Sequence, residues 1–186
     1  MKKTIKYILG YLKCTILRVG KFDKKVYIGR NVHIVNPKNL IIGERVSIRP
    51  EVDIFVDDKI SIGNECDIGT RNRFDGNIII EDEVLFGPDN YICSKDHNYE
   101  NIEKSIMKQG ASAIHKNGHN EIKIGKGSWI GTHVAIIGDV HVGKHCVIGA
   151  NSVVTKDVPD YSVAIGIPAK VIKKYNFEIK KWEKVR

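Results

Sequence analysis

The stretch Ile124–Val154, IGKGSWIGTHVAIIGDVHVGKHCVIGANSVV, decides the fold. Every sixth residue in it is aliphatic, and glycine directly follows four of these six. The aliphatic residues are Ile124, Ile130, Ile136, Val142, Ile148 and Val154. A period of six fits neither a helix, with 3.6 residues per turn, nor a strand, with two. It predicts short strands joined by turns, three to a triangular coil, with coils stacked into a solenoid.

The same ladder extends toward the N-terminus. It comprises Ile28, Ile34, Ile42, Ile48, Ile54, Ile62, Ile68, Phe74, Ile80, Phe86 and Ile92. The spacing gains two residues between Ile34 and Ile42, and again between Ile54 and Ile62. Small bulges at the corners are expected to absorb both slips. The longest interruption, 93–121, predicts a loop thrown out of the solenoid, and long loops in compact domains are commonly functional.

The length of 186 residues predicts a single domain. Charge is distributed unevenly along it. Residues 1–30 hold nine Lys/Arg and one acidic residue, and residues 170–186 hold seven and two. The intervening residues are net −5 within an overall charge of +8. This pattern does not predict a nucleic-acid-binding face. Basic ends suit phosphate groups, an anionic membrane surface, or solubility alone.

The four cysteines lack any C-x-x-C spacing, and Cys66 and Cys146 fall at inward positions of the repeat. They are expected to be core residues of a protein without disulfides or a zinc site, in a reducing cytoplasm. His115 and His119 stand four residues apart beside a glycine, which makes them a weak metal pair.

The two ends of the chain are expected to be helical. Residues 1–20 combine apolar residues at helical spacing with lysines, although Lys13 makes the apolar run too short to span a bilayer. A cap over the open end of the solenoid and a peripheral membrane contact are both consistent with this segment. Residues 177–184 are expected to form a short terminal helix. The predicted units are 1–25, the solenoid 26–172 and the tail 173–186.

Two polar groups are candidates for chemistry. Arg71, Asn72, Arg73 and Asp75 lie one coil before the loop, where a solvated corner is the alternative interpretation. The loop opens with Asp96-His97-Asn98-Tyr99. A loop histidine is usually a surface residue. An imidazole held at the end of a rigid stack is nevertheless a suitable proton acceptor for an alcohol.

The repeats, Ser128-Trp129-Ile130-Gly131, the stretch 150–159 and the segment 166–172 resemble the hexapeptide-repeat acyltransferases. The stretch after Trp129 is most similar to galactoside and maltose O-acetyltransferases, and the loop to acetyltransferases of surface polysaccharides. The resemblance implies a left-handed parallel β-helix and a homotrimer with acetyl-CoA between subunits. It places the catalytic histidine on His97 and an acceptor carboxylate on Asp75, with Arg71, Asn72 and Tyr99 as further acceptor-binding candidates.

The resemblance also assigns the coenzyme-binding positions, which are Trp129, Thr132, Ala150, Thr155, Lys156, Lys170 and Lys173. Several relatives have arginine at the last two positions, and lysine keeps the charge without the bidentate geometry. A sugar-binding asparagine of the galactoside enzymes has no clear counterpart, so a galactoside or maltose acceptor is in doubt. Thr132 is the expected oxyanion donor, and neither a metal nor an acyl-enzyme is required.

The expected function is therefore acetyl-CoA-dependent O-acetylation of a sugar hydroxyl in capsule, O-antigen or exopolysaccharide synthesis, in the cytoplasm or at the inner face of the membrane. N-acetylation of a nucleotide-linked amino sugar is the nearest alternative. A carbonic anhydrase with three zinc-binding histidines and a catalytically silent trimeric scaffold are the other classes considered.

Overall fold

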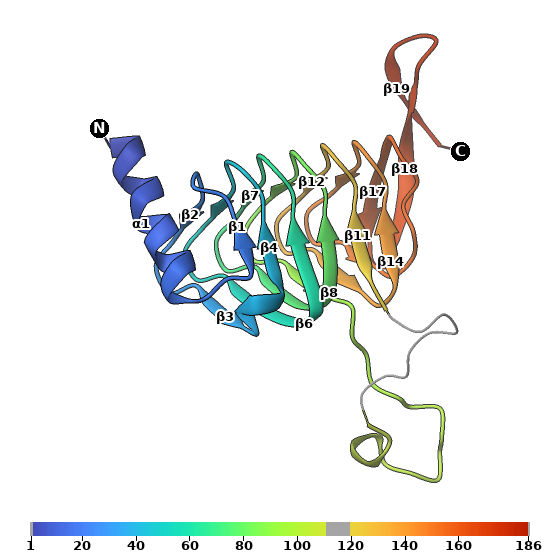
Figure 1. Ribbon diagram of the computed structural model, residues 1–186. Helices are drawn as coiled ribbons and strands as arrows, with labels where there is room; N and C mark the ends of the chain where they lie inside the picture. Colours follow the sequence, from blue (N-terminus) through green and yellow to red (C-terminus); the bar gives the residue numbers. More distant parts are fainter. Residues whose placement is uncertain (1, 111–119, 186) are drawn as a thin grey trace.

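The chain folds into a parallel β-solenoid, as the period of six predicts (Figure 1). A computed structural model describes residues 2–110 and 120–185. The helical elements are α1 (Lys2–Ile16) and the 3₁₀ turns η1 (Pro37–Asn39) and η2 (Ile106–Lys108). The strands are β1 (Lys21–Phe22), β2 (Tyr27–Ile28), β3 (His33–Val35), β4 (Leu40–Ile42), β5 (Ser47–Ile48), β6 (Asp53–Ile62), β7 (Asp67–Ile68), β8 (Arg73–Ile80), β9 (Leu85–Phe86), β10 (Tyr91–Cys93), β11 (Ile122–Ile124), β12 (Trp129–Ile130), β13 (Ala135–Ile137), β14 (Val140–Val142), β15 (Val147–Ile148), β16 (Val153–Val154), β17 (Ser162–Gly166), β18 (Ala169–Asn176) and β19 (Lys181–Lys184).

The solenoid has three faces. The first consists of seven parallel strands, β2, β5, β7, β9, β12, β15 and β17. The second consists of β3, the starts of β6 and β8, β10, β13 and β16; the third consists of β1, β4, the ends of β6 and β8, β11 and β14. We call the turns between the first and second faces the Thr132 corner, and those between the second and third faces the loop corner.

The aliphatic ladder is the core. Its side chains stack in register from coil to coil, so that Ile92 pairs with Phe74 on one side and with Ile136 on the other. All members of the ladder are buried, and each contributes about 1.5–3 kcal/mol through burial. The two aromatic members, Phe74 and Phe86, meet edge to face with ring centroids 5.3 Å apart. Cys66 and Cys146 lie in the same core, as predicted.

Both register slips occur at the loop corner, where extra residues are accommodated. The first coincides with η1, which follows Asn36 in a left-handed conformation (φ 55°). The second lies within β6, where the pairing with β8 shifts between Val56 and Ile60. There Val56 pairs with Gly76 and Ile60 with Ile78, so three residues of β6 lie opposite one residue of β8. The solenoid therefore keeps its register because the additions are confined to a corner.

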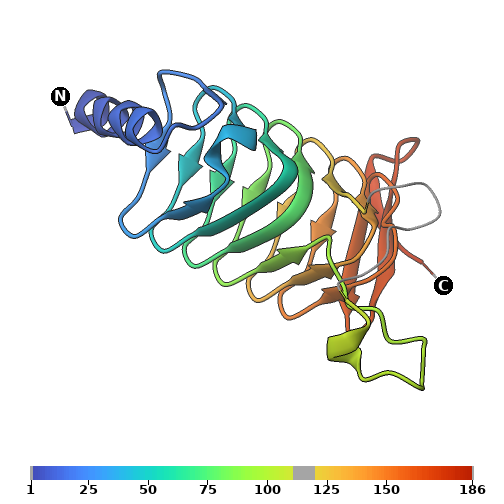
Figure 2. The same ribbon diagram turned by 60° about the horizontal axis from the view of Figure 1, so that its bottom comes forward.

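At the N-terminal end, α1 covers the open end of the solenoid (Figure 2). Cys14 is fully buried against the first coil. Gly10 lies so close to the Val26 carbonyl that any added side chain would collide with backbone. The Lys13 ammonium donates hydrogen bonds to the carbonyl oxygens of Ile28 (3.0 Å) and Gly29 (2.6 Å). Within the described residues, no helix has the length and apolar character needed to cross a bilayer.

The predicted C-terminal helix at 177–184 is wrong. The chain instead forms an antiparallel hairpin in which β18 pairs with β17, and β19 pairs with β18 (Figure 1). The last coil leaves the edge of β17 with unpaired backbone groups, and the returning segment satisfies them. Edge-to-face contacts between Tyr175 and both Phe177 and Trp182 stabilise the hairpin. This tertiary contact overrides the weak helical pattern of the tail.

Two stacked asparagines lie inside the Thr132 corner. Asn72 is only 1% exposed, and its amide donates to the carbonyl oxygens of Gly69 (2.8 Å) and Gly87 (2.9 Å). Its carbonyl oxygen accepts a hydrogen bond from the backbone of Asn90. Asn90 repeats the pattern one coil later and accepts from the backbone of Val134. The prediction that Asn72 binds the acceptor is therefore wrong, because its side chain is buried and fully engaged.

Replacing Asn72 by Ala is expected to lower the stability of the fold. The change leaves buried backbone groups unpaired, including the Asn90 N–H, at about 1–3 kcal/mol for each such group. Thermal unfolding followed by circular dichroism measures the loss. Asn39→Ala is the matched control, because that exposed amide makes one bond to Asp57 that water can replace. An unchanged melting temperature with a raised KM for the acceptor would contradict the structural role.

Candidate functional site

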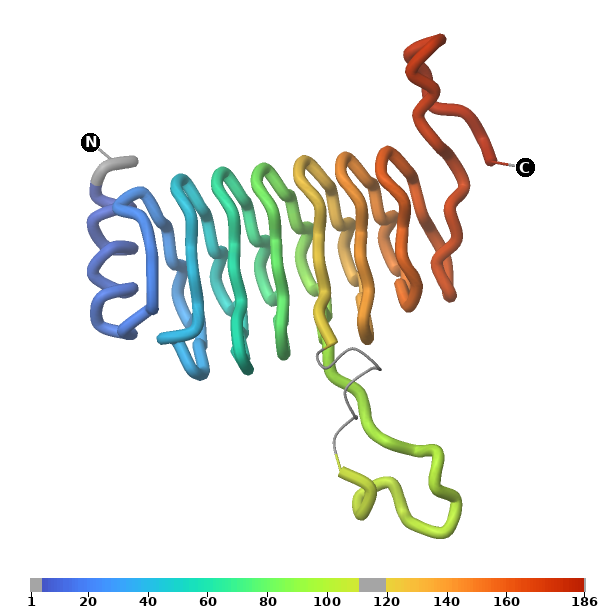
Figure 3. The backbone as a smooth tube through the Cα atoms, turned by 45° about the vertical axis from the view of Figure 1, so that its right-hand side comes forward, coloured from blue at the N-terminus to red at the C-terminus, as the bar shows by residue number. Residues whose placement is uncertain are grey.

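The long loop leaves the solenoid after Cys93 and rejoins it at Ile122. It stands away from the stacked coils (Figure 3). Within the described part, Gln109 closes the loop on itself, because its side chain bonds with the backbone of Asn101 and of Lys104. The amide of Asn98 also donates to the Gln109 carbonyl (3.1 Å). The segment 98–109 is thus a compact unit joined to the loop corner. His115 and His119 lie outside the described residues.

His97 lies at the start of this loop and its side chain is exposed. Its backbone N–H donates to the Asp96 carboxylate (2.8 Å), so Asp96 fixes the backbone at this position rather than the ring. Tyr99, two residues further on, is also exposed. Within the described residues, His97 makes no hydrogen bond to Thr132, to Ala150 or to the lysines assigned to the coenzyme. The chain therefore presents the imidazole outward.

A network of charges holds the root of the loop. The Lys95 ammonium lies 2.8 Å from carboxylate oxygens of both Asp57 and Asp75. Arg73 lies 3.2 Å from the other oxygen of Asp75 and stacks over the ring of Phe55, at 4.2 Å from its centroid. Burial lowers the pKa of Lys95, but its bonds to Asp57 and Asp75 outweigh burial and raise the pKa overall. Lys95 thus stays charged two residues before His97.

Asp75, the predicted acceptor carboxylate, has two cationic partners: Arg73, which belongs to the same predicted polar group, and Lys95, which was not predicted from the sequence. The Asp75 side chain is 14% exposed and faces outward on the second face. Arg73 lies two residues before Asp75 on β8, so the sequence alone places both side chains on the same side of the strand. Lys95 lies on the next coil, and its pairing with Asp57 and Asp75 depends on the register slips. Sequence spacing alone does not reveal it.

Arg71 lies apart from Asp75, at the Thr132 corner. It has a left-handed conformation (φ 55°), and its guanidinium bonds to both carboxylate oxygens of Asp89, at 2.6 and 2.9 Å. The hydrogen bond from Arg71 lowers the pKa of Asp89. His133 continues this column on the next coil, 3.9 Å from Asp89. Arg71 is thus part of a solvated corner, the alternative interpretation of the predicted polar group. It does not lie in one cluster with Asp75.

Thr132 and Ala150 lie on successive coils of the Thr132 corner. The backbone N–H of Asn151 donates to the Thr132 carbonyl (2.9 Å), which places the two turns directly above one another. The Thr132 hydroxyl donates to the Pro88 carbonyl (3.0 Å) and lies 3.1 Å from Nδ1 of His133. Its one proton is therefore engaged. To stabilise an oxyanion, this hydroxyl would have to turn away from Pro88.

The other coenzyme-binding candidates occupy three further places. Thr155 and Lys156 are exposed and follow β16 at the loop corner, and Trp129 is half exposed on the first face. Lys170 and Lys173 lie on β18, where they pair with Ile165 and Val163 of β17. Ile165 packs against Gly149, so Lys170 lies close to the Thr132 corner. One chain therefore carries Thr132 and Ala150 at the Thr132 corner, while Thr155, Lys156 and the root of the loop that holds His97 lie at the loop corner.

Three buried thiols and one phenol of the solenoid have raised pKa values. Burial raises the pKa of the Cys14 and Cys66 thiols to about 11 and also raises that of Cys146. A hydrogen bond with Cys93 raises the pKa of Tyr91 to about 12. These groups are therefore poor general bases at neutral pH.

The family described as bacterial transferase hexapeptide (six repeats) matches residues 121–156. The resemblance to hexapeptide-repeat acyltransferases is thereby confirmed.

Three known proteins are similar to this chain. The putative lipopolysaccharide biosynthesis O-acetyl transferase WbbJ of Escherichia coli is 36% identical over 110 residues, which are 55% of this chain and 56% of the relative. The galactoside O-acetyltransferase of Lactococcus lactis is 35% identical over 102 residues, 55% of this chain and 45% of the relative. The chain spans about half the length of these curated relatives. In a crystal structure, AntD, an N-acyltransferase from Bacillus cereus in complex with dTDP and coenzyme A, shares the fold (TM-score 0.76, 19% identity, 90% of both chains).

The change Lys170→Ala with Lys173→Ala is expected to raise the KM for acetyl-CoA several-fold and to affect kcat less. Loss of two cations weakens ground-state binding of phosphates without touching the reacting groups. Initial rates at several salt concentrations measure this, since screening should reduce the difference between variant and parent. The matched control is Lys180→Ala with Lys181→Ala at the hairpin tip, which removes the same charge elsewhere. Equal KM values for both double variants would refute the assignment.

Proposed function

We propose that this protein is an acetyl-CoA-dependent O-acetyltransferase that acts on a sugar hydroxyl in the synthesis of a surface polysaccharide. The observation that carries the proposal is the loop, which holds an exposed imidazole outside a rigid solenoid whose corner and hairpin present the coenzyme candidates. The similarity to WbbJ and to a galactoside O-acetyltransferase supports oxygen as the accepting atom. The similarity to AntD, described in complex with coenzyme A, supports the acyl donor.

In the proposed reaction His97 is the general base. It removes the proton of the sugar hydroxyl as the oxygen attacks the thioester carbonyl carbon of acetyl-CoA. The oxyanion of the tetrahedral intermediate is stabilised by a donor at the Thr132 corner. The intermediate then collapses, the carbon–sulfur bond breaks, and the imidazolium returns its proton to the departing coenzyme A thiolate. The products are an O-acetyl ester and free coenzyme A, and His97 is regenerated.

We also propose that the site lies between two copies of the chain in a homotrimer. Within one chain the loop stands away from the solenoid, and among the described residues His97 makes no hydrogen bond to Thr132 or Ala150. A neighbouring copy related by cyclic symmetry can bring its Thr132 corner to the loop. The loop of each copy then completes the site of the next.

A second candidate is N-acylation of a nucleotide-linked amino sugar. It is favoured by the fold similarity to AntD over 90% of both chains, because that protein is described as an N-acyltransferase in complex with dTDP. The two reactions differ in their need for a base. At neutral pH a hydroxyl needs a base to remove its proton as it attacks. An amine needs only to be in its uncharged form.

Replacing His97 by Ala is expected to lower kcat by roughly 10²–10⁴-fold, the usual loss for a missing general base, with coenzyme affinity unchanged. His141→Ala on β14 is the control, an exposed histidine on the third face. The second arm co-expresses His97→Ala with Ala150→Arg, a change that obstructs the Thr132 corner. Mixed oligomers are expected to regain activity that neither variant has alone. Full activity of His97→Ala would refute the base, and failure of complementation with intact oligomers would refute the shared site.

The acceptor is tested by offering the enzyme and acetyl-CoA a neutral oligosaccharide with only hydroxyl groups, and in parallel a panel of nucleotide-linked amino sugars. Transfer to a hydroxyl is expected, and mild alkali should release the acetyl group because the product is an ester. An alkali-stable acetyl group, formed only on the amino sugars, would replace the O-acetyl proposal with the N-acyl alternative.

A further inference from the structure

Helix α1 has two apolar sides, and only one of them serves the solenoid. Cys14 is fully buried and Leu17 packs against the core, while Gly10 lies against the Val26 backbone. A second stripe remains exposed, with exposed fractions between 49% and 77%; its members are Ile5, Leu9, Leu12 and Ile16. These residues are spaced by four, three and four, so they form one continuous line along the helix. Capping the solenoid requires the first side only, so the stripe is left without a structural role.

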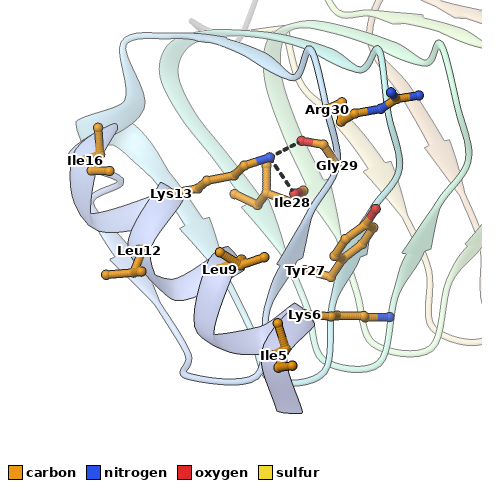
Figure 4. A pocket seen from close by; sticks show the side chains of 10 residues that line it. All are labelled: Ile5, Lys6, Leu9, Leu12, Lys13, Ile16, Tyr27, Ile28, Gly29 and Arg30. Atoms are coloured by element: carbon orange, nitrogen blue, oxygen red, sulfur yellow. Dashed lines mark hydrogen bonds between the residues drawn. The ribbon is translucent and has the colours of Figure 1, made fainter. Parts of the chain in front are cut away.

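The stripe borders an open hollow of about 510 Å³ between α1 and the first coil (Figure 4). The opposite wall is formed by Tyr27, Ile28, Gly29 and Arg30. The cations lining this hollow are Lys6, Lys13 and Arg30, and its lining contains no carboxylate. The Lys6 ammonium lies 4.7 Å from the centre of the Tyr27 ring, and Lys13 is held by two backbone carbonyls. Apolar side chains are thus framed by fixed positive charge.

The surrounding sequence strengthens this charge. Residues 1–30 hold nine Lys/Arg and one acidic residue. Lys24 and Arg30 are both exposed. An apolar stripe on a helix with a basic surround matches the physical requirements for lying in the interface of an anionic bilayer. There the apolar side chains enter the acyl boundary, and the negative surface potential of the bilayer attracts each nearby cation.

We propose that α1 and the first coil form a docking surface for an anionic lipid bilayer, with the stripe of Ile5, Leu9, Leu12 and Ile16 inserted at the interface. The charge favours lipid over a second copy of the chain, because two copies meeting here would oppose like charges. The length favours lying on the bilayer over crossing it, since α1 has 15 residues and a span needs about 20. This proposal concerns binding and stands independently of the acetyl-transfer proposal.

The experiment is sedimentation of the full chain with vesicles of phosphatidylcholine, with and without phosphatidylglycerol. Binding is expected only to the anionic vesicles, and added salt should weaken it because screening acts over about 8–10 Å. The variant Leu9→Ser with Leu12→Ser changes only the stripe and is expected to reduce vesicle partitioning by about tenfold or more, because two apolar side chains no longer enter the acyl boundary. Arg30→Glu should reduce binding to anionic vesicles as well.

Two controls make the outcome decisive. Phe177→Ser with Ile179→Ser removes exposed apolar side chains from the C-terminal hairpin, and Lys180→Glu reverses a charge there; neither should alter partitioning. Circular dichroism confirms that each variant is folded. Equal partitioning to neutral and anionic vesicles, or no effect of the stripe variant, would overturn the proposal. Concentration-dependent self-association that the stripe variant abolishes, without vesicle binding, would make a second copy the occupant.

Discussion

Register between successive coils is the constraint on which the rest of the structure depends. Each coil is too small to bury its own apolar side chains, so it is stable only when its ladder residue lies on that of the coil before. The pairing of Ile92 with Ile136 shows this most clearly, because the chain resumes the ladder after the long loop without a shift. The loop can therefore vary in content while its two ends stay fixed, which is a suitable arrangement for carrying a reactive side chain.

How far the sequence predicts this structure follows from the same constraint. The period of six predicts the coils, both slips and the loop, because every inward position of every coil has to be apolar. The period does not predict which polar residues of neighbouring coils contact one another. The burial of Asn72, the pair of Arg71 with Asp89 and the place of Lys95 between two carboxylates depend on which turns lie above one another. The terminal hairpin was not predicted for a similar reason. Residues 169–176 form a strand because they pair with the open edge of β17, and no local sequence pattern shows this pairing.

The candidate site reflects a division between rigid and extended parts. Turns of the Thr132 corner repeat nearly the same geometry on every coil, and backbone hydrogen bonds between coils hold them. Such turns can present backbone and small side chains to a long ligand, and one of them also carries the imidazole of His133. In the proposed reaction the loop supplies the base, and the charges around Asp75 fix the point from which the loop departs. Because this point lies at a different corner from Thr132, assembly of several copies becomes part of the proposed chemistry rather than an addition to it.

Charge is arranged along the solenoid axis in a way that links the two proposed ligands. In the middle of the chain, acidic residues pair with cations one coil away, as in Arg49 with Asp67 and Lys126 with Glu83. Each such exposed pair contributes little to stability, but together they neutralise the central coils. The excess positive charge therefore belongs to the two ends. One end offers it beside an exposed apolar stripe, which suits a bilayer; the other offers it on an antiparallel hairpin near the Thr132 corner, which suits the phosphates of a coenzyme. An enzyme arranged in this way would hold its acyl donor at one end of the solenoid while the other end rests where lipid-linked sugars reside.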